Sequence, residues 1–368
     1  MQNVSPNTIN PLASRWTSSN TDVAYVCADG TVVAIGEGTA TITCTMGDAT
    51  LACQADQSSE VTQTCEVTVG DAVVATEPKF TSAQLLLGEQ IKMRFWLTVP
   101  TGFDDTNASA VFSIEGKGTR TSQPITIAEA TPDQPNSRYA FDFELSSIEM
   151  AEPITCTFTY GENETVTYSY SVKDYVEAAL DMNLADAEKA CMKAIANYGH
   201  YMQPYLASAH DWTIGTDYAE MGLSYELDAN AARTGVQNFK PSLSGEGASD
   251  AGVTCSLSLD SYTTFDLFYA PAGGAELNAT ATFNNQQYTA EKVGSRYRIR
   301  VDRIKAAQLG DTVSVTGSVG GKSFTVNIEP LTYAYVVFNG TYGDVANNAI
   351  ASLYHYYSTA KQLLASQS

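Results

Sequence analysis

The sequence repeats itself at a separation of 158 residues, and this duplication restricts most of the chain to two copies of one module. Ser137-Arg138-Tyr139 recurs as Ser295-Arg296-Tyr297. Further pairs at this separation are Val166 with Phe324, Tyr168 with Val326, Tyr170 with Ile328, Tyr198 with Tyr356, and Leu206-Ala207 with Leu364-Ala365. A slip to 159 residues pairs Ile154 and Cys156 with Val313 and Val315. One duplicated unit explains all of these matches.

Each copy changes its hydrophobic period once. Apolar residues first alternate, as in a β-strand with one buried face, and the period then lengthens to that of a helix. The alternating residues of the first copy are Tyr139, Phe141, Phe143 and Leu145, followed by Val166, Tyr168, Tyr170 and Val172. We therefore expect each copy to be a β-sandwich closed by one C-terminal α-helix.

Both expected helices have an apolar face. In the first, Asn183 is suited to cap the helix, with Asp186 three residues on, and Pro204 should end or bend it. Its apolar face consists of Leu184, Ala187, Cys191, Ile195 and Tyr198. The second helix should begin near Asp344, and its apolar face consists of Ile350, Leu353, Tyr354 and Tyr357.

The N-terminal stretch also predicts short strands. Asp29-Gly30 and Gly36-Glu37-Gly38 are turn signals. The residues expected to face inward are Val32 and Ala34, then Ala40, Ile42 and Cys44, and later Cys65, Val67 and Val69. Trp16 is the one large side chain before these strands, so we expect it to fill a small core.

This pattern resembles the group 2 bacterial Ig-like domain over residues 4 to 70. The matching residues are Trp16, Ser18-Ser19-Asn20, Val23-Ala24, Val26, Gly30, Val32, Ala34, Gly38 to Thr43, and Cys65 to Val69. The family usually begins with one further strand, which we expect to be missing here. The resemblance implies a surface or secreted bacterial protein, and the family has no catalytic residues to transfer.

A looser resemblance concerns NYGHYMQPYL, residues 197–206. It is similar to the C-terminal helix of uncharacterised β-sandwich modules in secreted proteins of gut Gram-positive bacteria. The shared features are Asn-Tyr-Gly at the helix end with Gln203 and Tyr205 nearby. The second copy has His355-Tyr356-Tyr357 instead of Asn-Tyr-Gly, so the resemblance implies no ligand role there.

These patterns predict a mainly β chain of tandem Ig-like β-sandwich modules, the second and third each closed by a C-terminal α-helix. The expected segments are an Ig-like domain at 1–75, the first copy at 76–207, a linker at 208–252 and the second copy at 253–368. The linker is rich in Gly, Ser, Ala and Asp, which favours a flexible segment over a long excursion along the first copy.

The charge balance excludes several partners. The chain has 20 Lys and Arg against 41 Asp and Glu, a net charge of −21. Such a surface repels phosphate backbones, so nucleic acid is not an expected partner. No apolar run approaches the ~18 residues that cross a bilayer, so we expect no membrane insertion within this chain.

The motifs that resemble catalytic or metal sites have simpler explanations. Gly320-Gly321-Lys322-Ser323 ends like a P-loop, but the strand pattern that follows favours a β-hairpin. His200, His210 and His355 accompany no hydrolase or zinc motif. The acidic loops at Asp104-Asp105 and Glu162 to Glu164 favour solvated carboxylates, with calcium as the alternative. We expect no enzyme, no metal and no cofactor.

The seven cysteines, Cys27, Cys44, Cys53, Cys65, Cys156, Cys191 and Cys255, contain no C-x-x-C pair. We expect most of them to be buried thiols, with a Cys53 to Cys65 bridge as one alternative.

The candidate binding residues are Tyr198, Tyr201 and Tyr205, which fall on one helical face. Such a row can stack on sugar rings, but core packing explains it as well. We predict a non-catalytic cell-surface or secreted protein that acts in adhesion or as a binding scaffold, with a host or dietary glycan or an extracellular protein as its partner. The alternative is a carbohydrate-binding portion of a larger secreted polysaccharide-degrading enzyme.

Overall fold

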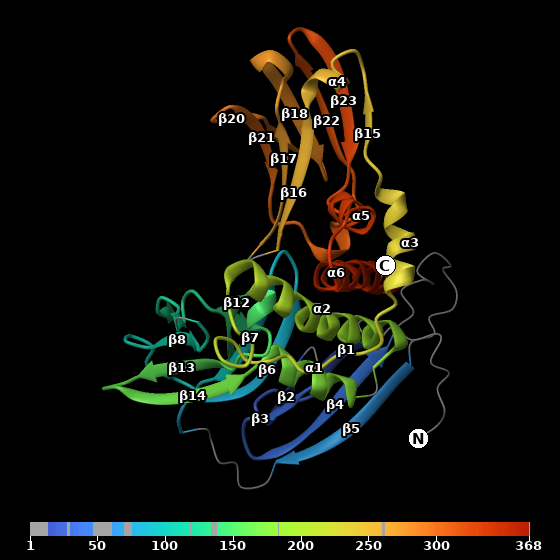
Figure 1. The fold of residues 1–368 in the computed structure, drawn as a ribbon. Helices are drawn as coiled ribbons and strands as arrows, with labels where there is room; N and C mark the ends of the chain where they lie inside the picture. Colours follow the sequence, from blue (N-terminus) through green and yellow to red (C-terminus); the bar gives the residue numbers. More distant parts are fainter. Residues whose placement is uncertain are drawn as a thin grey trace.

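The computed structural model describes residues 14–27, 30–46, 61–69, 76–117, 119–133, 138–182, 184–259 and 262–367. Over these residues the chain is mainly β, as predicted, with 41% strand and 28% helix. Two β-sandwiches are joined by a layer of helices, and an N-terminal sheet lies beside the first sandwich (Figure 1). No described helix is long and apolar enough to span a bilayer.

The N-terminal unit contains a three-stranded antiparallel sheet and a hairpin. The sheet has the order β1-β4-β5, from Ser14–Ser18, Gly38–Met46 and Val61–Val69, and the hairpin consists of β2 (Ala24–Val26) and β3 (Val32–Ala34). Ala40, Ile42 and Cys44 are buried, as predicted. Together with Val23 and Ala24, Ala40 forms the centre of this small core.

Three expectations for this unit are wrong. Val32 and Ala34 are exposed, because β3 pairs with β2 alone and turns these side chains outward. Cys65 also faces solvent, although Val67 and Val69 pack on the core as expected. Trp16 does not fill the core: it is half-buried, and its ring lies against Gly30. Gly30 has φ +85°, and a Cβ there would lie 3.0 Å from the indole.

The first repeat is a sandwich of two antiparallel sheets. One has the order β11-β12-β7-β6, from Thr131–Asp133, Arg138–Leu145, Ile91–Thr98 and Lys79–Leu87. The other has the order β10-β8-β13-β14 with β9 beside β8, from Ile125–Thr126, Ser109–Ile114, Ile154–Tyr160, Glu164–Tyr170 and Arg120–Thr121.

The second repeat has a similar topology, with β15 added at one sheet edge and a single strand, β19, beside β18 where the first repeat has β9 and β10 beside β8. Its sheets are β20-β21-β17-β16, from Glu291–Val293, Arg296–Val301, Thr263–Tyr269 and Val253–Leu259, and β19-β18-β22-β23-β15, from Gln286–Thr289, Leu277–Phe283, Val313–Val319, Lys322–Ile328 and Ser242–Ser244. The P-loop-like segment is the predicted hairpin, because Gly320 and Gly321, both at positive φ, turn β22 into β23.

One cross-strand ion pair occurs in both repeats, with its two charges exchanged between the strands. Arg94 on β7 binds Asp142 on β12 through two hydrogen bonds of 2.7 and 2.9 Å. At the equivalent register Asp266 on β17 accepts two bonds of 2.9 and 2.7 Å from Arg300 on β21. The arginine and the aspartate have therefore exchanged strands between the repeats, and the opposite charges remain paired.

Each repeat closes with two helices, one more than predicted. The first repeat ends with α1 (Val172–Leu180) and α2 (Asp186–His210), and the second with α5 (Thr332–Asn339) and α6 (Asp344–Gln367). Ser171 caps α1, since its hydroxyl accepts a bond from the Asp174 N–H and the Asp174 carboxylate accepts one from the Ser171 N–H. Helix α2 continues through Pro204, which is exposed, and the predicted cap Asn183 lies outside the described residues.

The segment predicted as a linker contains regular structure. Residues 211–228, which we name the connector, run from α2 to α3 (Ala229–Gly235), and β15 and α4 (Ala248–Ala251) follow. Strand β15 extends the second repeat's sheet by pairing with β23. Hydrogen bonds from both long helices also hold the connector, so it is not a free tether.

Candidate functional site

The first candidate site is the predicted tyrosine row, which the structure separates. Tyr198 is buried, and its ring centroid lies 5.3 Å from that of Tyr356 on α6. Burial raises the pKa of Tyr198 to about 12. Tyr201 and Tyr205 are half-buried, and the Tyr205 hydroxyl lies 3.4 Å from that of Tyr333. A sugar-binding role of this row stays a prediction.

The residues around Tyr198 show what the Asn-Tyr-Gly segment does. The Asn197 amide accepts a 2.7 Å bond from the Tyr225 N–H, and the Gln203 amide accepts a 2.8 Å bond from the Met221 N–H. Gln203 also donates to the Ala219 carbonyl at 2.7 Å. In the second repeat His355, the equivalent of Asn197, has its Nε2 2.9 Å from the Asp228 carbonyl oxygen. These polar side chains hold the connector.

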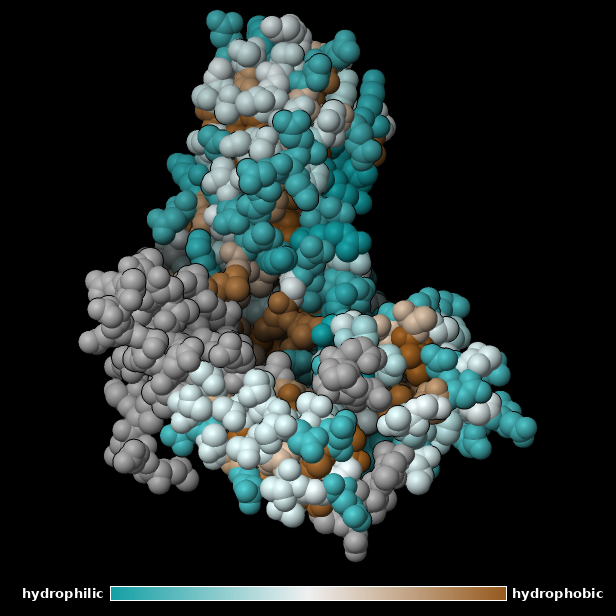
Figure 2. Space-filling model, turned by 180° about the vertical axis from the view of Figure 1, so that it is seen from behind, coloured by the Kyte–Doolittle hydropathy of each residue, from teal (hydrophilic) through white to brown (hydrophobic). Residues whose placement is uncertain are grey.

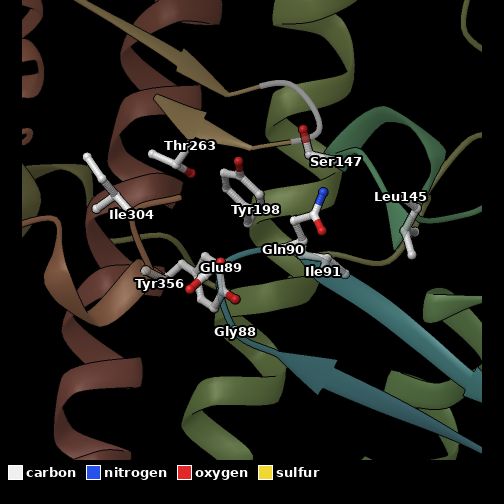
Figure 3. Close-up of a pocket in the computed structure, with 11 residues that line it drawn as sticks. Gly88, Glu89, Gln90, Ile91, Leu145, Ser147, Tyr198, Thr263, Ile304 and Tyr356 are labelled. Atoms are coloured by element: carbon white, nitrogen blue, oxygen red, sulfur yellow. The ribbon is translucent and has the colours of Figure 1, made fainter. Parts of the chain in front are cut away.

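The second candidate is a small polar cavity between the repeats (Figure 3), with a volume of about 40 Å³. Its lining comes from both repeats: Gly88, Glu89, Gln90, Ile91, Leu145, Ser147 and Tyr198 from the first, and Thr263, Ile304, Ala306 and Tyr356 from the second. Gln90 and Ser147 are 6% and 2% exposed, and Gln90 Nε2 has no hydrogen-bond partner among the described residues. The volume and these groups suit buried water rather than an organic ligand.

Arg138 forms a third cluster, where the N-terminal unit meets the first repeat. The side chain is 1% exposed, its guanidinium lies 4.3 Å from the centre of the Trp96 ring, and it donates to the Cys27 sulfur and, at 3.1 Å, to Ser82 Oγ. Asp133 lies 3.7 Å away and supplies a carboxylate. Arg296 occupies the equivalent position of the second repeat and is exposed. The N-terminal unit therefore contributes to the burial of this charge.

The fourth candidate is an apolar pocket of about 380 Å³ in the second repeat. It lies between the sheet edges and α5, and its lining consists of Pro241, Leu243, Val253, Thr254, Cys255, Val326, Ile328, Thr332, Tyr333, Val336 and Tyr342. Burial raises the pKa of the Cys255 thiol to about 11, so this thiol is protonated at neutral pH. Apolar residues are also visible at the foot of the upper sandwich in Figure 2.

The remaining candidates from the sequence are dispersed. Among the described residues, no group of three or more His, Cys, Asp or Glu side chains could hold a metal ion. His210 stacks on Trp212 at 4.5 Å, and Asp104 accepts bonds from its neighbour Thr106. Cys44, Cys156 and Cys191 are buried, as expected, whereas Cys65 is exposed; Cys53 lies outside the described residues.

Sequence reasoning missed the apolar pocket and the Arg138 cluster. The signal for the pocket was the replacement of Tyr168 and Tyr170 by Val326 and Ile328 at the repeat separation. For Arg138 no such signal exists, because its equivalent is also an arginine and only the docking of the N-terminal unit distinguishes the two positions.

Comparison with known proteins supports the Ig-like resemblance of the N-terminal unit. The bacterial Ig-like domain (group 2) family matches residues 4–56, which confirms the resemblance over most of the predicted span. No curated protein matches the chain. Among solved structures, the crystal structure of the S-layer protein rSbsC(31-844) is 11% identical, with 86% of this chain and 31% of that chain covered. Its TM-score of 0.13 is too low to support an argument about fold or function.

Proposed function

We propose that the chain is a non-catalytic bacterial cell-surface or secreted protein, a rigid scaffold of Ig-like modules that presents a binding or adhesive surface. The observation that supports this best is the junction between the repeats. Helices α2 and α6 pack directly together, with Tyr198 and Tyr356 buried between them. A buried apolar contact of this kind restricts relative motion of the two modules, which suits a scaffold.

The N-terminal unit supports the proposed location. It matches a family of bacterial Ig-like domains, and such domains occur in surface and secreted proteins. The net charge of −21 suits an exposed, soluble surface. Arg138 of the first repeat donates to the Cys27 sulfur of this unit within a buried cluster, which suits modules that are joined into one scaffold.

Antibodies raised against the purified chain test this proposal on the bacterium that encodes it. We expect them to label intact cells or to detect the protein in the culture medium. A cytoplasmic enzyme of the same bacterium, detected only after lysis, is the control. Detection of the chain only after lysis would overturn the proposed location.

A further inference from the structure

The apolar pocket lies where the second repeat lacks rings that the first repeat has. Strand register gives the correspondence: Phe80 pairs with Leu97 on β7, and Val253 pairs with Tyr269 at the equivalent place on β17. The inverted ion pair described above fixes this alignment of the strands. Val253 therefore stands where the first repeat has Phe80, just as Val326 and Ile328 stand where it has Tyr168 and Tyr170.

In the first repeat these three rings fill the space between the sheet edges. Phe80 and Tyr168 stack with their centroids 6.1 Å apart, and Tyr168 and Tyr170 stack at the same distance. Phe80 also meets Phe95 edge-on at 6.5 Å. The chain thus supplies its own aromatic filling at this place.

In the second repeat three aliphatic side chains leave the space open. Val253, Val326 and Ile328 all line the pocket of about 380 Å³. The second repeat has rings of its own, but Tyr269 and Phe324 pack on each other at 5.8 Å and neither lines the pocket. The pocket is therefore a difference between two otherwise similar sandwiches.

The chemistry of the lining restricts what can enter. None of the eleven lining residues is charged, so an ionised group inside would have no partner. The hydroxyls of Thr332 and Tyr333 already have partners in the Phe239 carbonyl and the Tyr205 hydroxyl, which leaves Thr254 and Tyr342 as the remaining side-chain hydroxyls of the lining. Leu243, Val336 and Tyr342 are exposed and form the mouth. Small-molecule sites typically have volumes of about 300 to 1,000 Å³ and a mostly apolar lining with few polar groups.

We propose that this pocket binds a neutral, aromatic small molecule, whose rings take the place that Phe80, Tyr168 and Tyr170 fill in the first repeat. One hydroxyl or N–H on the ligand would meet Thr254 or Tyr342. This inference does not depend on where the protein is located, so either proposal can fail without the other.

The test measures binding of two probes, 2-naphthol and indole, to the full chain at pH 7 by saturation-transfer difference NMR and by calorimetry. We expect both probes to bind, and Leu243→Glu at the mouth to weaken binding at least about tenfold, because it places a charge in the path of an apolar ligand. Val293→Glu is the matched control: Leu243 is 46% exposed and Val293 is 44% exposed, but Val293 lies outside the pocket. It should bind as the unmodified chain does.

A second variant rebuilds the filling of the first repeat. Val253→Phe combined with Val326→Tyr should abolish probe binding while the thermal unfolding midpoint stays within a few degrees. If this double variant does not fold, the comparison of Leu243→Glu with Val293→Glu decides alone. Absence of probe binding at millimolar concentration, or equal binding by the two glutamate variants, would overturn the proposal. Binding of the extended peptide acetyl-Phe-Val-Phe-amide but of neither probe would overturn it in favour of a protein partner.

Discussion

The rings of Tyr198 and Tyr356 lie 5.3 Å apart between centroids, and these two residues occupy the same position in the two repeats. Equivalent residues meet in this way at the centre of an isologous interface, where each partner offers the same surface to the other. The duplicated modules therefore contact each other as two subunits of a dimer would, within one chain.

Loss of either ring should destabilise the whole chain. We expect Tyr356→Ala to lower the free energy of unfolding by about 3 kcal/mol, because it removes a buried ring and leaves a cavity at the junction. Tyr201→Ala on the neighbouring helix, where the side chain is half-buried, should cost about 1 kcal/mol. Urea unfolding followed by circular dichroism measures both. Equal losses of unfolding free energy in the two variants would show that the junction contributes little to the stability of the chain.

Glycan arrays with and without calcium test the alternative of carbohydrate binding. We expect Tyr201→Ala and Tyr205→Ala to leave any array signal unchanged, because two half-buried rings and one buried ring do not form an exposed platform. Binding to one glycan class that either substitution weakens would favour the carbohydrate-binding alternative and locate its site on α2.

The inverted ion pair makes a prediction about charge reversal. Asp142→Arg should lower stability by about 1 kcal/mol, because it places two guanidinium groups opposite each other on β7 and β12. Adding Arg94→Asp should restore most of this loss by reproducing the polarity of Asp266 and Arg300 in the second repeat. Urea unfolding at low and high salt measures the recovery. A double variant less stable than the single one would contradict the equivalence of the two pairs.

The repeated module is predictable from the sequence. The alternation of apolar residues is a local pattern, and the recurrence of Tyr198 as Tyr356 appears when the two halves of the sequence are aligned. The short helices α1 and α5 escaped prediction, since each follows a strand almost without a break and has less than three turns of helical period. Strand β3 was assigned the wrong inward face, because three residues in a two-stranded hairpin give no tertiary information about which side is covered.

The candidate site was less predictable for a related reason. Tyr198, Tyr201 and Tyr205 do share a helix, as their spacing requires, but sequence periodicity does not reveal that a second copy of the same helix covers Tyr198. Composition likewise predicted a flexible linker at 208–252, whereas backbone groups in that segment bind side chains distant in sequence. In both cases the structure depends on contacts between residues that are distant in sequence.

The connector should become accessible when its anchor is removed. Gln203 accepts a bond from the Met221 N–H and donates to the Ala219 and Ile148 carbonyls, so Gln203→Ala leaves three backbone groups without their partner. We expect limited proteolysis within 211–228 to become several-fold faster, consistent with a cost of about 1 to 3 kcal/mol for an unsatisfied buried group. Pro204→Ala, exposed on the same helix, is the control. Unchanged cleavage would mean that other contacts hold the connector.

Glu152 gives the connector a dependence on pH. Burial, and to a smaller extent the charges of Glu149 and Glu115, raise the pKa of this carboxyl above its ordinary value of 4.5, although the Ala219 N–H donates to it and acts in the opposite direction. A carboxyl with a raised pKa in the folded state contributes stability that is complete below the unfolded pKa and is lost as pH rises through the folded pKa. Glu152→Gln removes this loss while keeping an acceptor for Ala219.

The variant should therefore gain stability relative to the unmodified chain as pH rises from about 4 to 7, and the two should converge at the acidic end. Urea unfolding at a series of pH values measures the difference, and Glu162→Gln, in an exposed turn, is the control for the loss of one carboxyl group elsewhere. A difference that grows toward low pH instead would mean that the folded chain favours the charged form of Glu152, and that the hydrogen bond from Ala219 outweighs the cost of burial.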